Sequence, residues 1–415
     1  MKNSKILNIL FIHHELPGQF IHLIRYLSNH PQYNVFGISN KQDDSFYNES
    51  LFQKAYTYQP KEIEGSLTHH YVTDLQRSVL NAQAIFDILQ KFKQQNIDFD
   101  LAIAHTGWGG GLYFKEAYPA TPLLGYVEFF FHLDGADVGF DPKFPVSIDR
   151  RLQIKTLNAQ LLLGMNECDG LVTPTPWQKS LFPDIWHSKI NVIHEGVDVD
   201  LCKPDNQITF TLPSGQELTG KDEVVTYSAR NLEPYRGFPI FLKAIERICQ
   251  RRPNCHIIIT GGDEISYSKK LPKGETYREK YLKTVSLPKD KVHFLGKVPY
   301  KTHLQLLQLS SVHIYLTYPF VLSWSFMEAM ACGCVIIASG TRPVLDVLEP
   351  GVNGISVNFF DDEQIADQID DVFKHPERKK QLGLAARDKI KRHYQHQFSI
   401  NQYLLLFKQL IEKNA

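Results

Sequence analysis

The chain has 415 residues, of which 43% are hydrophobic and 22% charged, and Lys+Arg and Asp+Glu balance at 45 each. The length predicts two or three domains, and the composition excludes a disordered, collagenous or coiled-coil protein. The lack of a basic excess argues against nucleic acid as a partner. Six cysteines without a Cys-x-x-Cys pair predict neither a disulfide framework nor a zinc site, so we expect a reducing, cytoplasmic compartment. No apolar segment reaches the roughly 18 residues that span a bilayer.

The first half of the chain alternates short apolar segments with segments of helical periodicity. We predict strands at residues 6–12, 35–38, 101–104, 122–127, 171–173 and 191–193. Apolar residues three and four positions apart predict helices between them, as over 20–27 and 75–89. This alternation is typical of a doubly wound parallel sheet.

A polar stretch at residues 203–222 interrupts the alternation and is a candidate domain boundary. A second series of strands follows at 224–228, 256–260, 292–295, 313–316 and 335–338, and helices follow at 362–373, 376–393 and 400–410. The prediction is an α/β protein with two Rossmann-like, doubly wound parallel-sheet domains, 1–202 and 203–385, facing a cleft. The C-terminal helices, 386–415, are expected to pack back toward the first domain. Ligands of such sheets bind at the carboxyl ends of the strands.

Both common phosphate-binding motifs are absent. The turn after the first strand reads HELPGQ (residues 14–19) rather than Gly-x-Gly-x-x-Gly, and no Gly-x-x-x-x-Gly-Lys-Ser/Thr loop occurs. The two-domain layout therefore belongs neither to a dehydrogenase with the usual fingerprint nor to a P-loop protein.

Two arginines in the second domain point to a bound anion. The segment ARNLEPYRG (residues 229–237) directly follows a predicted strand and opens a helix. Arg230 and Arg236 can clamp a diphosphate because a guanidinium presents fixed parallel donors to phosphate, and the helix N-terminus adds backbone N–H groups. Two ordinary surface arginines in a loop are the alternative.

Glu328 is the one acid in a strongly apolar helical segment, 324–333. Burying a carboxylate without a partner costs several kcal/mol. The hydroxyl pair of a ribose would satisfy it, and an internal partner is the alternative.

Five motifs occur in a fixed order: ARNLEPYRG (229–237), GGD (261–263), VHFLG (292–296), MEAMACG (327–333) and GVNG (351–354). Together they resemble the donor half of the retaining family-4 glycosyltransferases, which have the GT-B fold. The segment VIHEGVD (192–198) resembles the one that precedes the interdomain linker in these enzymes. The resemblance is good over residues 170–360 and looser elsewhere.

The resemblance implies roles for residues that match the family's motifs. Arg230 and Arg236 would act on the donor diphosphate as catalytic residues, and Glu328 would hold the ribose. The remaining donor-binding positions are Val298 beside the base, the backbone at Val321, Leu322, Ser323 and Trp324, and Gly18 in the first domain. The first acid of the family's Glu-x7-Glu motif falls at Phe320 and is absent, which leaves the sugar contacts open.

The first domain would then bind the acceptor. Glu128 follows a predicted strand at the position where many relatives have a histidine, and we expect it to act as an auxiliary acid/base or orienting residue. His105 and His132 are predicted acceptor-binding residues. These histidines, with His13 and His14, can instead be ordinary strand-end residues, while a zinc site is disfavoured by their spacing. Loops 41–70 and 133–146 would set acceptor specificity.

The resemblance and the residues together predict a retaining glycosyltransferase of hexosyltransferase type. It would move a sugar from a nucleotide-sugar to a hydroxyl of a glycan, a lipid-linked or a small-molecule acceptor, with no cofactor and no metal. A nucleotide-sugar epimerase of the same fold and a non-catalytic nucleotide-sugar-binding scaffold are the alternatives. Seven basic residues within 378–392 predict a peripheral contact with the inner membrane face, and a solvated helix face is the competing interpretation.

Overall fold

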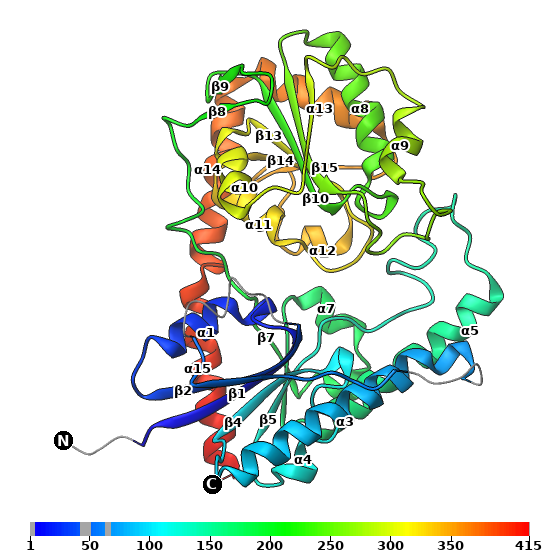
Figure 1. Cartoon of the computed structure of the whole chain (residues 1–415). Coiled ribbons are helices and arrows are strands. Elements are labelled where there is room, and N and C mark those ends of the chain that lie inside the picture. Colours follow the sequence, from blue (N-terminus) through cyan, green and yellow to red (C-terminus); the bar gives the residue numbers. More distant parts are fainter. Residues whose placement is uncertain (1–4, 42–50, 63–67, 415) are drawn as a thin grey trace. The chain divides into compact units, whose positions relative to one another are not determined.

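The computed structural model of the chain describes residues 5–41, 51–62 and 68–414 (Figure 1). The chain forms two compact units: the first comprises Met1–Gly196 and His396–Ala415, and the second comprises Val197–Gln395. The boundaries expected at 202/203 and 385/386 therefore differ from this division, in which the second unit begins earlier and ends later. Parts of the expected acceptor loop 41–70 lie outside the described residues.

The first unit is built on a seven-stranded sheet with the order β3-β2-β1-β4-β5-β6-β7. All its neighbouring strands pair in parallel. The strands are β1 (Leu7–Glu15), β2 (Tyr33–Lys41), β3 (Lys54–Thr57), β4 (Leu101–His105), β5 (Leu123–Tyr126), β6 (Gly170–Thr173) and β7 (Ile190–Val192). Because every strand runs in one direction, all the carboxyl ends meet at one edge.

Helices cover both faces of this sheet. They are α1 (Ile21–Ser28), α3 (Thr73–Gln94), α4 (Phe114–Ala117), α5 (Ile148–Leu157), α6 (Ala159–Glu167), α7 (Pro176–Leu181) and α15 (His396–Asn414), with short 3-10 turns η1 (Gly18–Phe20), η2 (His70–Val72), η3 (Thr106–Trp108) and η4 (Asp184–Trp186). Successive strand residues point to opposite faces. Leu10 and Ile12 of β1 accordingly join the core under α3, whereas Ile9 and Phe11 join the core under α1 and α15.

The C-terminal helix α15 belongs to the first unit. Its side chains Ile400, Tyr403, Phe407 and Leu410 are all buried in the core that β1 and α1 share. The preceding helix, α14 (Pro376–His393), lies in the second unit. The two C-terminal helices thus divide between the units.

The second unit contains a six-stranded parallel sheet with the order β12-β11-β10-β13-β14-β15. Its strands are β10 (Val224–Asn231), β11 (His256–Gly262), β12 (Val292–Gly296), β13 (Val312–Tyr315), β14 (Val335–Ser339) and β15 (Ile355–Val357). Its helices are α8 (Phe238–Arg251), α9 (Tyr277–Leu282), α10 (Tyr300–Leu309), α11 (Trp324–Ala331), α12 (Arg342–Leu345), α13 (Asp362–Lys374) and α14, with a 3-10 turn, η5 (Pro234–Arg236). The predicted fold class, two Rossmann-like α/β units, is confirmed.

The stretch expected to be an interdomain linker is part of the second unit. It forms an antiparallel hairpin of β8 (Thr209–Thr211) and β9 (Glu217–Thr219). Ile208, Leu212 and Leu218 pack in one core cluster with Val224 of β10. These few apolar side chains anchor a segment whose prolines, glycines and polar residues predicted a domain boundary.

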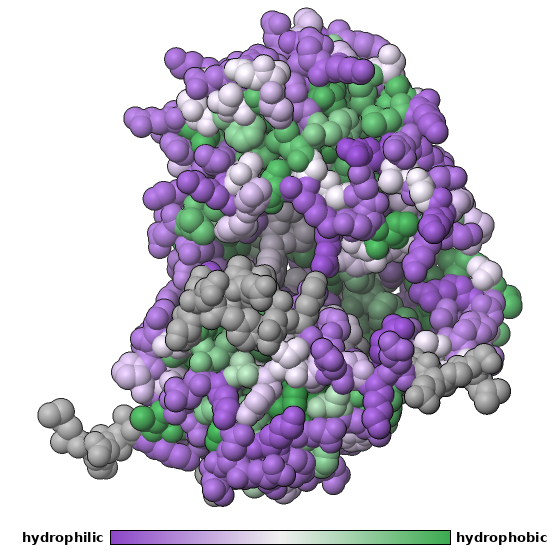
Figure 2. All heavy atoms as spheres, viewed as in Figure 1, coloured by the Kyte–Doolittle hydropathy of each residue, from purple (hydrophilic) through white to green (hydrophobic). Residues whose placement is uncertain are grey.

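Hydrophilic residues cover most of the visible face, and hydrophobic residues form scattered patches on it (Figure 2). Among the described residues, no helix combines the length and the apolarity that a bilayer crossing requires.

Candidate functional site

Three predicted or suspected functional side chains come together at the carboxyl edge of the first sheet. His13 lies near the end of β1, His105 ends β4, and Glu128 comes two residues after β5. Glu128 Oε1 accepts a hydrogen bond from Gln19 Nε2 at 3.1 Å. The other carboxylate oxygen, Oε2, lies 3.8 Å from His105 Nε2. The structure thus places Glu128 beside the predicted acceptor-binding His105.

The hydrogen bonds of His105 orient its imidazole. Its Nδ1 accepts the backbone N–H of Gly107 at 3.1 Å, so a neutral ring carries its proton on Nε2, the nitrogen nearest Glu128. The indole of Trp108 stacks on the ring with centroids 4.0 Å apart. The Nε2 atom is buried and has no hydrogen-bond partner among the described residues. His105 is therefore arranged to donate toward a group that approaches Glu128.

Burial and neighbouring groups set the charges at this edge. Burial, and to a lesser extent the charge of His105, lowers the pKa of His13 to about 3. Burial alone would raise the pKa of Glu128, but the neighbouring His105 ring and the hydrogen bond from Gln19 outweigh it and lower the pKa below its usual value. At neutral pH the edge therefore presents the neutral imidazole of His13 and the ionised carboxylate of Glu128.

Gly18 packs against the ring of His13, whereas His132 is bonded to the end of α7. Gly18 has φ +49°, and a Cβ there would lie 2.4 Å from the Cε1 atom of His13, so only glycine lets this turn pack on the imidazole. His132 Nε2 donates to the carbonyl oxygen of Leu181 at 2.6 Å. Its ring is thus engaged at the end of α7, and no hydrogen bond joins it to His105 or Glu128 in the described chain.

At the carboxyl edge of the second sheet, Arg236 is a buried cation. Its side chain is 8% exposed, and Nη1 donates to Thr317 Oγ1 at 2.6 Å. The hydroxyl of Tyr315 is 3.4 Å from Nη1, and the guanidinium carbon lies 5.3 Å from the ring centre of Tyr267. Every one of these partners is neutral, and no ion pair with a carboxylate occurs in the described parts of the chain.

Arg230 occupies a different environment. It lies exposed near the end of β10, whereas Arg236 is enclosed in η5. The expectation that both arginines converge on one anion stays a prediction, with Arg236 the more firmly placed of the two.

The segment before α11 is tied to Arg236. The carbonyl oxygen of Val321 is 3.5 Å from Arg236 Nη1. The N–H of Ser323 donates to the hydroxyl of Tyr315 at 2.9 Å, so this backbone donor, which the sequence assigned to a ligand, already has an internal partner. Trp324 begins α11 with 45% of its surface exposed, and Leu322 packs against the α11 core.

Glu328 has internal partners as well. Its Oε1 accepts from the hydroxyl of Tyr300 at 2.7 Å, and Oε2 lies 3.0 Å from His303 Nε2. Both partners come from α10, which begins two residues after the predicted base-binding Val298. A tyrosine and a histidine thus satisfy this buried acid, which agrees with the alternative of an internal partner. A ribose contact at the same carboxylate remains a prediction.

Phe320, at the position of the missing acid, lies in an aromatic cluster. Its ring centre is 5.5 Å from that of Tyr235 and 5.2 Å from that of Tyr267. Tyr267 also faces the guanidinium of Arg236. An apolar wall thus stands beside the buried cation.

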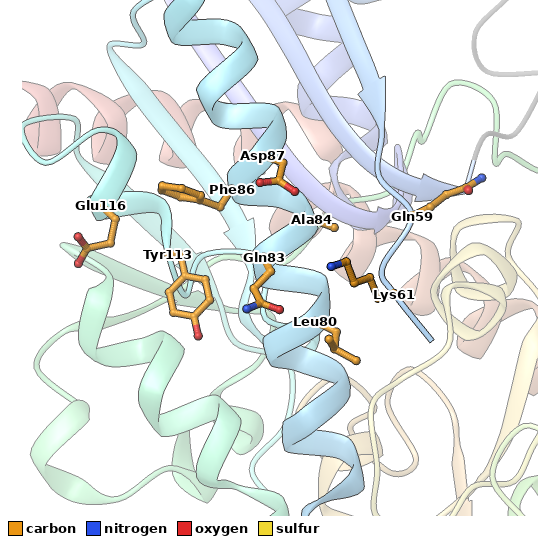
Figure 3. Close-up of a pocket in the computed structure, with 9 residues that line it drawn as sticks. All are labelled: Gln59, Lys61, Leu80, Gln83, Ala84, Phe86, Asp87, Tyr113 and Glu116. Atoms are coloured by element: carbon orange, nitrogen blue, oxygen red, sulfur yellow. The ribbon is translucent and has the colours of Figure 1, made fainter. Parts of the chain in front are cut away.

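The structure also contains a cavity of about 550 Å³ in the first unit, lined by residues of α3 and neighbouring segments (Figure 3). The lining residues are Gln59, Lys61, Leu80, Gln83, Ala84, Phe86, Asp87, Tyr113 and Glu116. No predicted site residue contributes to it. Within residues 5–41, 51–62 and 68–414, no group of three His, Cys, Asp or Glu side chains is arranged to hold a metal ion.

Two family models match consecutive parts of the chain. "Glycosyl transferase family 4 group" matches residues 33–202, and "Glycosyl transferases group 1" matches residues 213–389. The chain belongs to the family-4-like GT-B glycosyltransferases. The resemblance seen in its motifs is thereby confirmed.

Solved structures share the fold over nearly the whole of this glycosyltransferase. HepE from Anabaena, in complex with UDP-glucose, has a TM-score of 0.68 at 16% identity and covers 97% of this chain and 100% of its own. Sucrose-phosphate synthase from Thermosynechococcus elongatus also has a TM-score of 0.68 at 16% identity, with 98% and 99% covered.

Curated relatives match over shorter spans. Spore coat protein SA of Bacillus subtilis is 26% identical over 219 residues, 50% of this chain and 55% of that protein. The uncharacterized glycosyltransferase MJ1069 of Methanocaldococcus jannaschii is 28% identical over 121 residues, 29% of this chain and 31% of that protein. The chain thus spans about half or less of the length of these relatives.

Several residues at the two sheet edges were not predicted. They are the partners of the predicted side chains: Gln19, Trp108, Gln178, Tyr300, His303, Tyr315 and Thr317. His13, by contrast, was recognised among the histidines at strand ends. The unpredicted partners come from different elements, and spacing along the chain does not reveal their proximity.

Proposed function

We propose that this protein transfers a sugar, of hexose type, from a nucleotide-sugar to an acceptor hydroxyl with retention of configuration. The observation that carries the proposal is the buried guanidinium of Arg236, whose partners are neutral. A buried charge without an ionised partner is costly, so this pocket gains stability when an anion binds. A diphosphate is the anion that a glycosyltransferase donor supplies at that position.

The reaction breaks the bond between the anomeric carbon and the diphosphate oxygen. The acceptor oxygen forms a bond to the same carbon from the same face, and its proton passes to the departing phosphate. Negative charge grows on the diphosphate as the bond breaks, and a preorganised cation stabilises it most in the transition state. Arg236 supplies that cation, and Arg230 is its proposed companion.

Glu128 has a separate role in this scheme. It is ionised and is oriented by Gln19, and His105 lies beside it. A fixed carboxylate accepts the hydrogen bond of a sugar hydroxyl and so positions the acceptor without being an obligatory base. His105 donates from Nε2 to the same ligand. We propose no direct ligand contact for His132.

The donor is proposed to be a UDP-sugar for the first experiments, since HepE was solved with UDP-glucose and with UDP. Arg236 would neutralise charge that other transferases assign to a divalent cation, so the proposal needs no metal and no cofactor. Chelation with EDTA is therefore expected to leave turnover unchanged, whereas a loss restored by Mg²⁺ or Mn²⁺ would contradict this part.

The deciding measurement is nucleotide release from the full chain. UDP release from UDP-glucose and other UDP-sugars is followed with and without glycan, lipid-linked and small-molecule acceptors, and NMR reports the anomeric configuration of the product. We expect acceptor-dependent release with retention. Release of UDP with an altered free sugar, without any acceptor, indicates an epimerase. Binding of UDP without any turnover indicates a non-catalytic scaffold. If calorimetry detects no nucleotide binding, the proposed donor site is wrong.

A further inference from the structure

Glu233 is a buried carboxylate that the proposed reaction leaves unused. It immediately precedes η5 and is 1% exposed. Its Oε2 atom accepts the backbone N–H groups of Tyr267 at 3.1 Å and of Ser268 at 2.8 Å. Its own carbonyl oxygen accepts the N–H of Arg236 at 3.1 Å. Glu233 therefore ties η5 to the segment between β11 and α9, which contains Tyr267 and Ser268.

The side chain of Glu233 is costly where it lies. Its second oxygen, Oε1, is buried and has no hydrogen-bond partner among the described residues. A buried carboxylate with an unpartnered oxygen lowers the free energy of unfolding, and an uncharged amide of the same shape costs less. Stability therefore does not account for an acid at this position. A buried polar group of this kind calls for another explanation.

The segment that Glu233 holds brings an aromatic ring to Arg236. The guanidinium carbon lies 5.3 Å from the ring centre of Tyr267, within the range of a cation–π contact. The same ring centre lies 5.0 Å from that of Tyr235 and 5.2 Å from that of Phe320. Tyr267 is 39% exposed and belongs to neither a helix nor a strand, so packing alone fixes it weakly. Its place over the cation depends on the backbone bond that Glu233 accepts.

Another hydrogen bond joins the same two segments in the opposite direction. The N–H of Tyr235, in η5, donates to Ser268 Oγ at 3.2 Å, while the N–H of Ser268 donates to Glu233. Donors and acceptors thus alternate between the two segments, which fixes the position of one along the other. Hydrogen bonds to a charged acceptor are roughly twice as strong as neutral ones, so the carboxylate is the strongest part of this connection.

We propose that Glu233 is a positioning residue: its carboxylate holds Tyr267 against the guanidinium of Arg236 and thereby keeps this cation aimed at the donor diphosphate. The inference rests on the proposed function, in which Arg236 stabilises the leaving group. A preorganised cation is effective only while its direction is fixed, and a displacement of about 1 Å can cost about 10²-fold in rate. Glu233 thus lowers stability in favour of alignment, as groups at functional sites commonly do.

The first test is Glu233→Gln, which keeps the shape of the side chain and removes its charge. In UDP release assays with donor and acceptor, kcat is expected to fall about tenfold, since a weakened anchor lets Tyr267 and the guanidinium shift. The KM for the donor should change less than about threefold, because charge on the diphosphate grows as the bond breaks. The melting temperature is expected to equal or exceed that of wild type. A residue with only a structural role would give the reverse, a lower melting temperature with wild-type kcat.

Two further substitutions identify the path of the effect. Tyr267→Leu removes the ring, and the double variant E233Q/Y267L is expected to lose no more kcat than the more damaged single variant, because both changes break one chain of contacts. Asp222→Asn is the matched control, since Asp222 Oδ2 also accepts a backbone N–H, from Thr219 at 2.7 Å, but just after β9. It should keep the wild-type kcat. Losses that multiply in E233Q/Y267L, or an equal loss in D222N, overturn the inference.

A readout without catalysis separates this inference from the proposed function. In protein with isotope-labelled arginine, the NMR signal of the Arg236 Nε–H group is identified by its absence in Arg236→Lys, and the ring of Tyr267 shifts it. We expect Glu233→Gln to move this signal in the same direction as Tyr267→Leu, and D222N to leave it in place. If wild type transfers no sugar but the signal moves, the proposed function fails and Glu233 still holds Arg236. An unmoved signal, or a moved signal with wild-type kcat, overturns the inference.

Discussion

The two sheet edges differ in how their polar groups are satisfied. In the second unit, Glu328 already has a tyrosine and a histidine, and Arg236 already has a threonine. In the first unit, the Nε2 atoms of His13 and His105 are buried without hydrogen-bond partners among the described residues. Glu328 and Arg236 are therefore held by neighbouring side chains of their own unit, whereas His13 and His105 each leave a buried ring nitrogen that a ligand can satisfy. The same is true of one carboxylate oxygen of Glu233, next to η5 in the second unit.

The largest effect is expected from Arg236→Ala, which removes the only buried cation proposed to face the leaving group. Losing one preorganised donor for a developing charge costs about 10²- to 10³-fold in turnover. Replacing Arg236 removes a costly buried charge and also its bond to Thr317, two changes that act on stability in opposite directions, so turnover and not the melting temperature carries this prediction. Turnover assays measure the catalytic loss, calorimetry with UDP measures the loss of nucleotide affinity, and thermal unfolding checks that each variant is folded. Wild-type turnover in a folded Arg236→Ala protein would move the donor site elsewhere.

Glu128→Gln tests the carboxyl edge of the first sheet, where we propose that the acceptor binds. Removing a charged hydrogen-bond acceptor costs about 1.5–3 kcal/mol, or about 10- to 150-fold. We expect the loss in transfer to the acceptor, while UDP affinity stays at its wild-type value. Gln178→Ala, which removes only the bond to the Glu128 backbone carbonyl, is the matched control and should cost less. An equal loss of UDP affinity would show that Glu128 serves the donor.

Acid titration compares a buried histidine in each unit. Burial is the main cause that lowers the pKa of both His13 and His313 to about 3. Both values lie below the 6.5 of the unfolded chain. The unfolded chain therefore binds more protons between these values, so stability is full above pH 6.5 and falls as the pH drops toward 3. Each histidine contributes a loss of about 2 kcal/mol by about pH 5.

Thermal unfolding across that range should show a shallower decline in His13→Gln and in His313→Gln. Glutamine cannot take up the proton, so only the pH-dependence, and not the absolute melting temperature, is diagnostic. Unchanged slopes in both variants would mean that the histidines are protonated in the folded chain.

Glu328→Gln tests the second unit, where the carboxylate of Glu328 already has hydrogen-bond partners within the protein. If the carboxylate also holds the ribose, the affinities for UDP and for the UDP-sugar should fall together, by about fivefold for one weakened hydrogen bond. Tyr300→Phe removes an internal partner without touching the acid and should change these affinities less. Calorimetry with both ligands provides the comparison. Unchanged UDP affinity would leave Glu328 as a purely structural acid.

The smallest effect is expected from Phe320→Glu, which restores an acid beside Tyr235 and Tyr267. The change should alter the order in which UDP-sugars compete, by a few-fold at most, because one solvent-accessible hydrogen bond contributes about 1 kcal/mol. UDP itself should bind as before. Phe320→Leu is the control for loss of the aromatic ring. An unaltered order of donors would place Phe320 outside the sugar pocket.

The strands were predictable because parallel strands buried on both faces are continuous apolar runs, as in β4 and β14. β3 was missed because Lys54–Thr57 is half-buried and begins with a lysine. The hairpin of β8 and β9 was missed because its polar residues outnumber the few that anchor it. In the site, Arg236 and Glu328 were recognised from motifs, and Glu128 from its place after a predicted strand. Their burial and partners were not, since Thr317, Gln19 and Tyr300 lie far away in sequence.

The placement of α15 has a consequence for the order in which the protein is made. The second unit is one continuous piece, Val197–Gln395, and all of it has been synthesised before α15. The first unit lacks Ile400, Tyr403 and Phe407 until α15 leaves the ribosome, and until then the sheet face that α1 and α15 share is only partly covered. The unit whose synthesis begins before the other is therefore the one that completes its core after it.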